Sequence, residues 1–194
     1  MVTSSKWPNR RSIRLPQYEY ASVGVYFVTI CTHQRETNLG EVKDGKVLLS
    51  DAGEIVEHIW KRLTWFFKSI ELDAFCIMPN HVHGIIVIER AMQRAVSKSS
   101  LGEEAAALPL QFGSPPQSIP AIVQNLKSVS AKKINLLRQT PGAPVWQRNY
   151  YEHVVRMSQG QQELQTIRKY IDDNPLKWEL DSENPSYIAK PRGN

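Results

Sequence analysis

Hydrophobic residues follow two different periods along the chain, and these periods predict its strands and helices. Strand-like runs are rich in β-branched and aromatic residues and are bounded by turn residues. The turn sequence KDG at 43–45 predicts a hairpin, and a short turn at Pro79-Asn80 separates two later runs. The strands that we predict cover residues 23–32, 46–49, 72–78, 81–88 and part of 145–156.

Three segments carry apolar residues at helical spacing. The first begins at Asp51, which we interpret as an N-cap with Glu54 three residues later, as in a capping box. The second covers about 120–139 with a proline in its first turn. The third covers about 159–174 and is stopped by Pro175. Their apolar positions are Ile55, Ile59 and Leu63, then Ile122, Leu126, Val129, Leu136 and Leu137, and finally Leu164, Ile167 and Ile171.

The coarse order of elements is β–β–α–β–β–α–β–α. This order predicts an α+β fold in which helices pack on an antiparallel sheet. A ferredoxin-like sandwich with a hairpin insertion fits the order, and its C-terminal helix would carry Tyr170. We expect one domain over residues 1–194, with a basic N-terminal arm at about 1–20, a flexible insertion at about 92–119 and an irregular tail at about 176–194.

Composition indicates the cellular compartment of the protein. No apolar run approaches the roughly 20 residues needed to cross a membrane. No apolar segment follows the basic N-terminus, as it would in a secretory signal. Cys31 and Cys76 lie in strand-like runs, and we interpret them as reduced core residues. We therefore expect a cytoplasmic protein that has no membrane partner.

Charge adds a mild preference for polyanions, because the net charge is +5. Four cations gather near the N-terminus beside Trp7, and they are Lys6, Arg10, Arg11 and Arg14. Two interpretations remain open for this segment. It is either a solvated basic leader or an arm that binds a phosphate backbone.

A pair of histidines opens the strand predicted at 81–88. His81 and His83 are two residues apart, so their side chains point to the same face of a strand. Neutral imidazoles bind divalent metals, and two nitrogens leave coordination positions open for water or a substrate oxygen. The pair also fits two ordinary polar positions. A metal site would need a further ligand from elsewhere in the chain.

A metal that polarises a phosphate needs an attacking group. Water would make the protein a nuclease, whereas a tyrosine would form a covalent phosphotyrosyl link. Tyr170 lies at the flank of the apolar stripe of the third helix, and Asn174 four residues later lies on the same side. A flanking position lets the ring pack while the hydroxyl reaches out, but it equally fits an ordinary tyrosine at a core edge. Of Tyr150 and Tyr151, one is expected in the core.

Several stretches together resemble one known family, the REP-associated tyrosine transposases of the single-strand HUH class. HVH at 81–83 alone is weak evidence, but its combination in order with WQRNYYEH and KYIDDNP is specific. The resemblance covers roughly residues 8–180 and leaves 92–119 unmatched. The stretches that carry it are RRSIRLPQYEYASVGVYFVTICTHQR, MPNHVHGIIVI, LKSVSAKKIN, VWQRNYYEHVVR and RKYIDDNPLKW.

The resemblance implies a ferredoxin-like catalytic domain that acts in DNA transposition. His81 and His83 would be ligands for Mg²⁺ or Mn²⁺, and Tyr170 would be the nucleophile. Asn174 stands where relatives carry a third polar ligand, often glutamine, which is one methylene longer. The family cuts single-stranded DNA beside short palindromic hairpins and leaves the 5′ phosphate on tyrosine. Such a protein would be nucleoid-associated when it is bound to DNA, as a monomer or a homodimer.

DNA contacts have to come from basic residues. Our candidates for phosphate contacts are Lys127, Lys132, Lys133 and Arg148, together with Arg10, Arg11 and Arg14. Lysines on a helix are commonly just solvated, and Lys133 falls within the apolar stripe, where it would either snorkel or point at bound phosphate. His153 and Glu152 are either structural or near the site. Two other functions stay open: a hairpin-binding protein without catalysis, and a metal nuclease that uses water.

Overall fold

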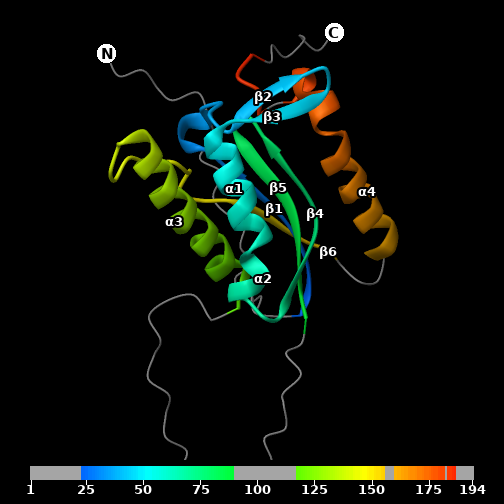
Figure 1. Ribbon diagram of the computed structural model, residues 1–194. Helices are drawn as coiled ribbons and strands as arrows, with labels where there is room; N and C mark the ends of the chain where they lie inside the picture. The colour runs from blue at the N-terminus through cyan, green and yellow to red at the C-terminus, as the bar shows by residue number, and fades with distance from the viewer. Residues whose placement is uncertain (1–22, 90–116, 156–159, 182, 187–194) are drawn as a thin grey trace, which may run out of the picture.

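A four-stranded antiparallel sheet is the centre of the part of the chain that the computed structural model describes, residues 23–89, 117–155, 160–181 and 183–186 (Figure 1). The strand order is β4-β5-β1-β6. This is the order of a ferredoxin-like fold, so the predicted α+β architecture is confirmed. The strands are β1 (Gly24–Cys31), β4 (Ile70–Met78), β5 (His81–Ile88) and β6 (Tyr151–Val155).

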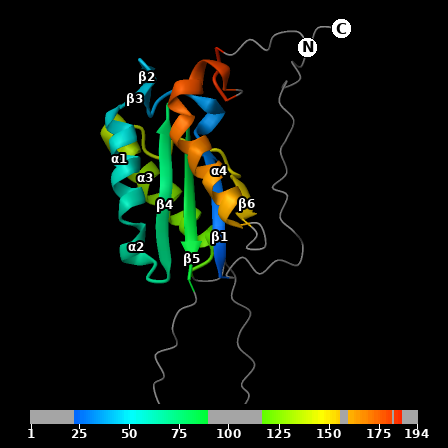
Figure 2. The same ribbon diagram turned by 90° about the vertical axis from the view of Figure 1, so that its right-hand side faces the viewer.

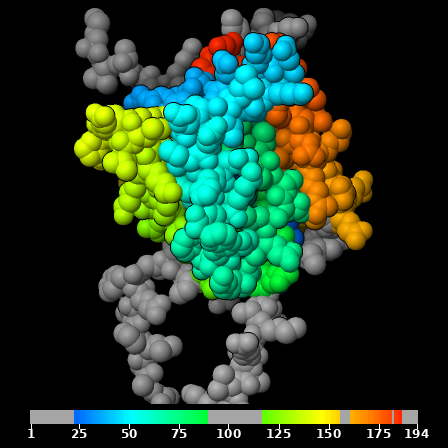
Figure 3. Space-filling model, in the orientation of Figure 1, coloured from blue at the N-terminus to red at the C-terminus, as the bar shows by residue number. Residues whose placement is uncertain are grey.

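One face of the sheet packs against two helices. They are α1 (Asp51–Lys61), followed by the short α2 (Leu63–Phe66), and α3 (Ile119–Arg138). Figure 1 shows both long helices on the same side of the sheet, and Figure 3 shows α1 covering this face below the hairpin. Alternate residues of the central strands point into this layer, because successive side chains of a strand face opposite sides. The strand residues buried here include Tyr26, Val28, Ile30, Val82 and Ile86.

The opposite face packs against α4 (Gly160–Asp173), which crosses the strands in Figure 2. A small apolar cluster of Phe27, Ile85 and Ile171 joins the helix to the sheet. Of the other β5 residues on this face, His81 and His83 are polar and Val87 is apolar. The strand period of two therefore sends Val82 and Ile86 into the layer of α1 and α3, while the histidines share the opposite face with Ile85.

A separate hairpin lies beyond one end of the sheet, as predicted. It consists of β2 (Gly40–Lys43) and β3 (Lys46–Leu49). Asp44 and Gly45 join the strands with φ angles of 52° and 70°, which matches the left-handed turn that favours glycine. Two 3₁₀ turns also lie near this end, namely η1 (His33–Arg35) and η2 (Pro175–Leu180). The expectation that the tail is irregular from 176 is therefore wrong for its first residues.

The N-cap of α1 differs from the prediction by one residue. Ser50, not Asp51, has the extended backbone of a cap, and its side chain accepts a hydrogen bond from the amide of Gly53 at 3.2 Å. Asp51 is the first helical residue, where its carboxylate still suits the positive end of the helix. Serine and aspartate both cap well, so the sequence alone did not separate them.

The buried face of α3 is rotated from the predicted one. Ile122 and Leu126 are buried as expected, but Leu136 and Leu137 are 81% and 49% exposed. Ile134 is buried instead, and Leu136 two residues later lies about 200° around the helix from it. Lys133 is exposed and therefore lies outside the stripe. On α1, Val56 and Trp60 are buried beside the predicted Ile59.

Gly84 allows α1 to approach the sheet. A β-carbon at this position would lie 2.3 Å from two carbons of the Trp60 indole, a rigid ring that is only 1% exposed. The same ring stacks on Phe75 with its centroid 5.7 Å away. We therefore expect Gly84→Ala to lower the free energy of unfolding by about 1–3 kcal/mol through overpacking. Urea unfolding followed by circular dichroism measures this loss.

Gly24→Ala is the matched control for this experiment. A β-carbon at Gly24 would meet the Tyr26 ring at an ordinary 3.4 Å. We expect this variant to unfold within about 1 kcal/mol of the parent protein, since glycine in a strand is itself unfavourable. Equal stability of Gly84→Ala and Gly24→Ala would contradict the close packing of Trp60 on β5.

Candidate functional site

The two histidines lie side by side on the face of the sheet that α4 covers. Their ring centroids are 4.4 Å apart, and the residues are 0% and 3% exposed for His81 and His83. His81 pairs with Cys31 and His83 with Thr29 across the β1–β5 ladder. The strand geometry therefore places two buried imidazoles next to each other, as the spacing predicts.

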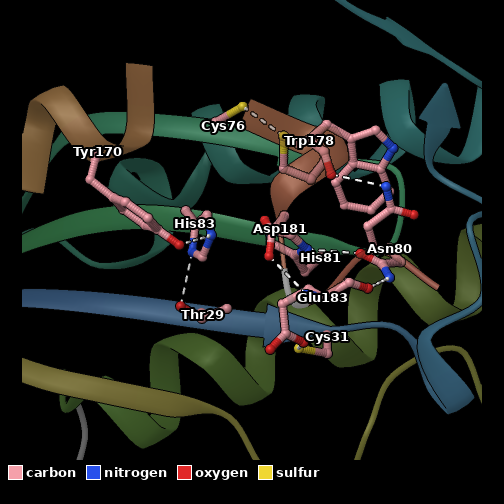
Figure 4. Close-up of polar contacts among 12 residues, drawn as sticks. Thr29, Cys31, Cys76, Asn80, His81, His83, Tyr170, Trp178, Asp181 and Glu183 are labelled. Carbon is pink, nitrogen blue, oxygen red and sulfur yellow. Dashed lines mark hydrogen bonds and ion pairs between the residues drawn. The ribbon is translucent and has the colours of Figure 1, made fainter. Parts of the chain in front are cut away.

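Each histidine has an oxygen partner at Nδ1. The Nδ1 atom of His83 is 2.9 Å from the Thr29 hydroxyl, and that of His81 is 2.8 Å from Oδ1 of Asn80 (Figure 4). The Asn80 amide nitrogen donates to the carbonyls of Arg35 and Glu183 at 3.3 and 2.6 Å. Its Oδ1 is therefore an acceptor, so His81 carries its proton on Nδ1. The Nε2 lone pair of His81 is left free, as in metal-binding histidines.

Tyr170 reaches this pair from α4. Its hydroxyl is 3.3 Å from Nε2 of His83, and its ring packs edge-on against Phe27 at 6.1 Å between centroids. The residue is 44% exposed, so Tyr170 lies at the edge of the core with its hydroxyl directed at the buried His83.

An ion pair between α4 and β4 fixes the position of α4 along the sheet. Nε of Arg168 donates to both carboxylate oxygens of Asp73 at 3.1 Å, and Nη2 donates to Oδ2 at 2.5 Å. These hydrogen bonds lower the pKa of Asp73 below its usual value. Planar bidentate pairs of this kind hold a fixed geometry. Arg168 therefore positions the helical turn that carries Tyr170.

Asn174 and Asp181 complete the polar site from the segment after α4. Asn174 continues the helical backbone with φ −59° and ψ −43° and is 4% exposed. Three buried atoms of this site have no hydrogen bond of ordinary geometry among the described residues: Oδ1 of Asn174, Nε2 of His81 and Oδ2 of Asp181. The Asn174 side chain is nevertheless close enough to raise the pKa of His81 and to lower the pKa of Tyr170 and of Asp181. Sequence reasoning missed Asp181, since it assigned that segment to an irregular tail. It also missed the Asn80 and Thr29 partners, although Asn80 directly precedes HVH.

Burial determines the charge state of the site. Desolvation lowers the pKa of His83 to about 4, and it lowers the pKa of His81 well below its usual value, with the charges of His83 and Arg35 adding to the effect. Desolvation raises the pKa of Tyr170, as does the charge of Asp181. It also raises the pKa of Asp181. At neutral pH both imidazoles are therefore neutral, and the Tyr170 phenol keeps its proton.

The residues fit a divalent cation only as a mixed set. Among the described residues, no three His, Cys, Asp or Glu side chains form a ligand cluster by themselves. The two Nε2 atoms and the amide oxygen of Asn174 together offer two nitrogens and one oxygen. Neutral imidazole and amide oxygen both suit hard or borderline divalent ions. The contact of 3.9 Å between His81 and Asp181 is no ion pair, because the imidazole is neutral.

The predicted DNA contacts do not gather at this site. Lys132 and Lys133 are exposed on α3, which covers the opposite face of the sheet, and Arg148 is exposed in the loop before β6. The Lys127 ammonium donates to the carbonyls of Gln147, Arg148 and Asn149 at 2.9, 3.4 and 2.9 Å. Burial lowers its pKa to about 8. Lys127 therefore supports a loop here. Arg10, Arg11 and Arg14 lie outside the described residues.

His153 and the two cysteines have the following contacts and burial in the described chain. His153 on β6 pairs with Glu163 on α4 at 2.7 Å. Cys31 and Cys76 are free and partly buried, and burial raises the pKa of Cys76 to about 11, which makes it a thiol at neutral pH. Within the described part of the chain, no helix is long and apolar enough to span a membrane.

The buried histidines predict how stability depends on pH. The pKa of His83 falls from 6.5 to about 4 on folding, so the unfolded chain binds more protons below pH 6.5. Its stabilising contribution is complete above that pH and is lost as the pH falls toward 4, by about 2 kcal/mol between pH 7.5 and 5. Thermal unfolding of His83→Gln should show a smaller loss over this range than the parent, whereas His58→Gln, at an exposed histidine of α1, should retain it. Parallel curves for the parent and His83→Gln would contradict this assignment.

Comparisons with known proteins agree with this geometry at the level of fold. No known protein family profile matches the chain. An uncharacterized protein of Haemophilus influenzae is 36% identical over 173 residues, which cover 89% of this chain and 92% of that protein. The structure is also similar to a solved structure described as a REP-associated tyrosine transposase bound to a REP hairpin, with a TM-score of 0.51 and 15% identity over 79% of this chain and 67% of the other. The chain therefore belongs to one family with the Haemophilus protein, and the resemblance to REP-associated tyrosine transposases that its motifs predict is confirmed at the level of the fold.

Proposed function

We propose that this protein is a metal-dependent endonuclease and strand transferase for single-stranded DNA. It cuts beside palindromic repeat hairpins and keeps the cut strand on Tyr170 as a 5′-phosphotyrosine. The observation that carries the proposal is the hydroxyl of Tyr170, which lies 3.3 Å from Nε2 of His83 within a site whose other polar atoms are buried. A tyrosine that served only the core would not need its oxygen at a histidine pair.

His81, His83 and Asn174 would hold the divalent cation, Mg²⁺ or Mn²⁺. When bound, such an ion polarises the scissile phosphate and neutralises charge on it. The Asn80 and Thr29 oxygens keep the Nδ1 atoms occupied, so that both Nε2 atoms are turned toward the ion. Asparagine is shorter than the glutamine of relatives, but the chain continues its helical backbone through Asn174, which keeps the amide inside the site.

Tyr170 performs the covalent step. Its oxygen forms a bond to phosphorus while the bond from phosphorus to the 3′ oxygen breaks. The phenol gives its proton to water, and the departing 3′ oxygen takes a proton from water to become a hydroxyl. Attack by the same or another 3′ hydroxyl reverses the step and returns tyrosine, which is strand transfer without a further energy source. Burial and the charge of Asp181 raise the pKa of Tyr170, so the phenol holds its proton until the step begins.

Space for a DNA strand lies beside the nucleophile. A groove of about 750 Å³ runs between β6 and α4, and its lining includes Phe27, Tyr151 and Thr166. Phe27, which lines the groove, contacts the rings of both Tyr151 and Tyr170, so one ring separates the groove from the tyrosine. Exposed aromatic side chains such as Tyr151 suit the stacking of unpaired bases. The hairpin preference is supported by the sequence motifs and by the REP hairpin in the similar solved structure.

Tyr170→Phe should abolish formation of a covalent adduct. A single-stranded hairpin oligonucleotide with a 3′ label, drawn from repeats flanking the gene, is incubated with full-length protein and Mn²⁺. The label should migrate with the parent protein on a denaturing gel and should fall below about 1% of that level in Tyr170→Phe, because no other group attacks. Tyr26→Phe removes a phenol that is buried in the layer of α1 and α3 on the opposite face of the sheet and should keep the adduct.

Other results of this assay would support one of the two alternative functions. Cleavage without an adduct that persists in Tyr170→Phe would indicate a nuclease that uses water. Hairpin binding with neither cleavage nor adduct would indicate a binding protein without catalysis. Either result would overturn the proposed nucleophile.

Removal of divalent ions should stop the reaction reversibly. EDTA should eliminate the adduct in the assay above, and excess Mn²⁺ or Mg²⁺ should restore it, because the ion would supply the polarisation of the scissile phosphate. His81→Ala should lower the rate of adduct formation by at least about 100-fold at fixed Mn²⁺, since one ligand is lost. An adduct that forms at full rate in EDTA would contradict metal dependence.

A further inference from the structure

We infer that Asp181 is an additional, anionic ligand of the divalent cation. It lies in the segment after the tyrosine helix, seven residues beyond Asn174, and none of the sequence motifs includes it. The inference deepens the proposed function and rests on it, since both concern the same ion. It adds a carboxylate to a set that would otherwise consist of two neutral imidazoles and a neutral amide.

The carboxylate of Asp181 has one oxygen fixed and one oxygen free. Oδ1 accepts a hydrogen bond from the amide of Glu183 at 2.8 Å, which orients the side chain. Oδ2 is buried and has no hydrogen-bond partner among the described residues. It points toward Nε2 of His81, at 3.9 Å (Figure 4). This distance is too long for a hydrogen bond.

The two neighbouring polar atoms are also hydrogen-bond acceptors that no donor occupies. The Nδ1 proton of His81 is used by Asn80, so the buried Nε2 atom presents a lone pair, and Oδ1 of Asn174 is a third acceptor without a partner. His81 and Asn174 are 0% and 4% exposed. Leaving such groups unpaired inside a protein is costly. A cation among them would satisfy all three at once. The Asn174 amide lies near enough to raise the pKa of His81 and lower that of Asp181, but no hydrogen bond of ordinary geometry forms at these three atoms among the described residues.

The tail is held in place by the same network that holds His81. The Asn80 amide donates to the carbonyl of Glu183 at 2.6 Å while its oxygen binds His81. The side chain of Glu183 pairs with Arg35 on η1. These contacts of Glu183, two residues beyond Asp181, keep the Asp181 carboxylate at the histidine. The position of Asp181 is therefore built into the fold.

The distance between His81 and Asp181 is compatible with both residues binding one ion. Two atoms that bind one ion at about 2.1 Å can be at most about 4.2 Å apart. The 3.9 Å between His81 and Asp181 is within that limit. Among the described residues no three His, Cys, Asp or Glu side chains form a ligand group, so Asp181 would have to approach the imidazoles when an ion binds.

Mn²⁺ binding to the full-length protein without DNA tests the inference directly. Electron paramagnetic resonance of free Mn²⁺ gives the dissociation constant without any catalytic step. Asp181→Asn should weaken binding at least about ten-fold, since it removes the charge and one ligand oxygen. Glu179→Gln removes a carboxylate from the exposed face of η2 and should bind Mn²⁺ like the parent.

Thermal unfolding separates ligation from a structural role. If Asp181 is a ligand, Asp181→Asn should unfold in EDTA at or above the temperature of the parent, because an amide can donate to Nε2 of His81. The rise in unfolding temperature that Mn²⁺ causes in the parent should be reduced in this variant. A lower unfolding temperature in EDTA together with unchanged Mn²⁺ affinity would assign Asp181 a structural role and overturn the inference.

Failure of the inference and failure of the proposed function give different results. Equal Mn²⁺ affinity of the parent and Asp181→Asn, with an adduct that still needs Mn²⁺, overturns the inference and leaves the proposed function standing. A parent protein that binds no Mn²⁺ overturns the inference, because these contacts require a site formed before DNA arrives. If the adduct also forms in EDTA, the metal dependence of the proposed function fails as well.

Discussion

The register between β1 and β5 is the constraint on which the rest of the structure depends. Because a strand alternates its faces, one register sends Val82, Gly84 and Ile86 into the layer of α1 and α3 and turns His81 and His83 toward α4. A shift by one residue would bury the histidines among apolar side chains and expose the core. The hydrophobic layer therefore fixes the polar site, although the two lie on opposite faces of the sheet.

Asn80 also holds the site together, because its side chain makes hydrogen bonds to three different segments of the chain. It accepts from His81 and donates to the carbonyls of Arg35 and Glu183. The orientation of one imidazole, the loop after β1 and the segment after α4 are thereby coupled. Buried networks of this kind are stable only when each member is satisfied. The atoms that lack partners in this network, on His81, Asn174 and Asp181, all belong to the proposed ion site.

The histidine pair and Tyr170 lie on the opposite face of the sheet from the exposed cations of α3. The exposed cations of α3 lie on the layer opposite Tyr170, and Lys127 is engaged by the loop at 147–149. A strand that lies along the groove between β6 and α4 would meet Phe27 and Tyr151 before it met those cations. Recognition of bases near the cut and attraction of the phosphate backbone would then be tasks of different surfaces.

The sequence by itself determined the local elements and the place of the histidine pair. Its periodicity placed β1, β5 and α3 within one or two residues of their observed bounds, and the spacing of His81 and His83 placed both rings on one face. Tertiary packing decided that Ser50 is the cap of α1 and that Ile134, not Leu136, faces the core on α3. The local sequence is compatible with either choice at both places. Only the tertiary structure brought Tyr170 to His83, from 87 residues away, and turned Asp181 toward His81. Such contacts leave no periodic signal, because they depend on how a helix and a tail close over a sheet.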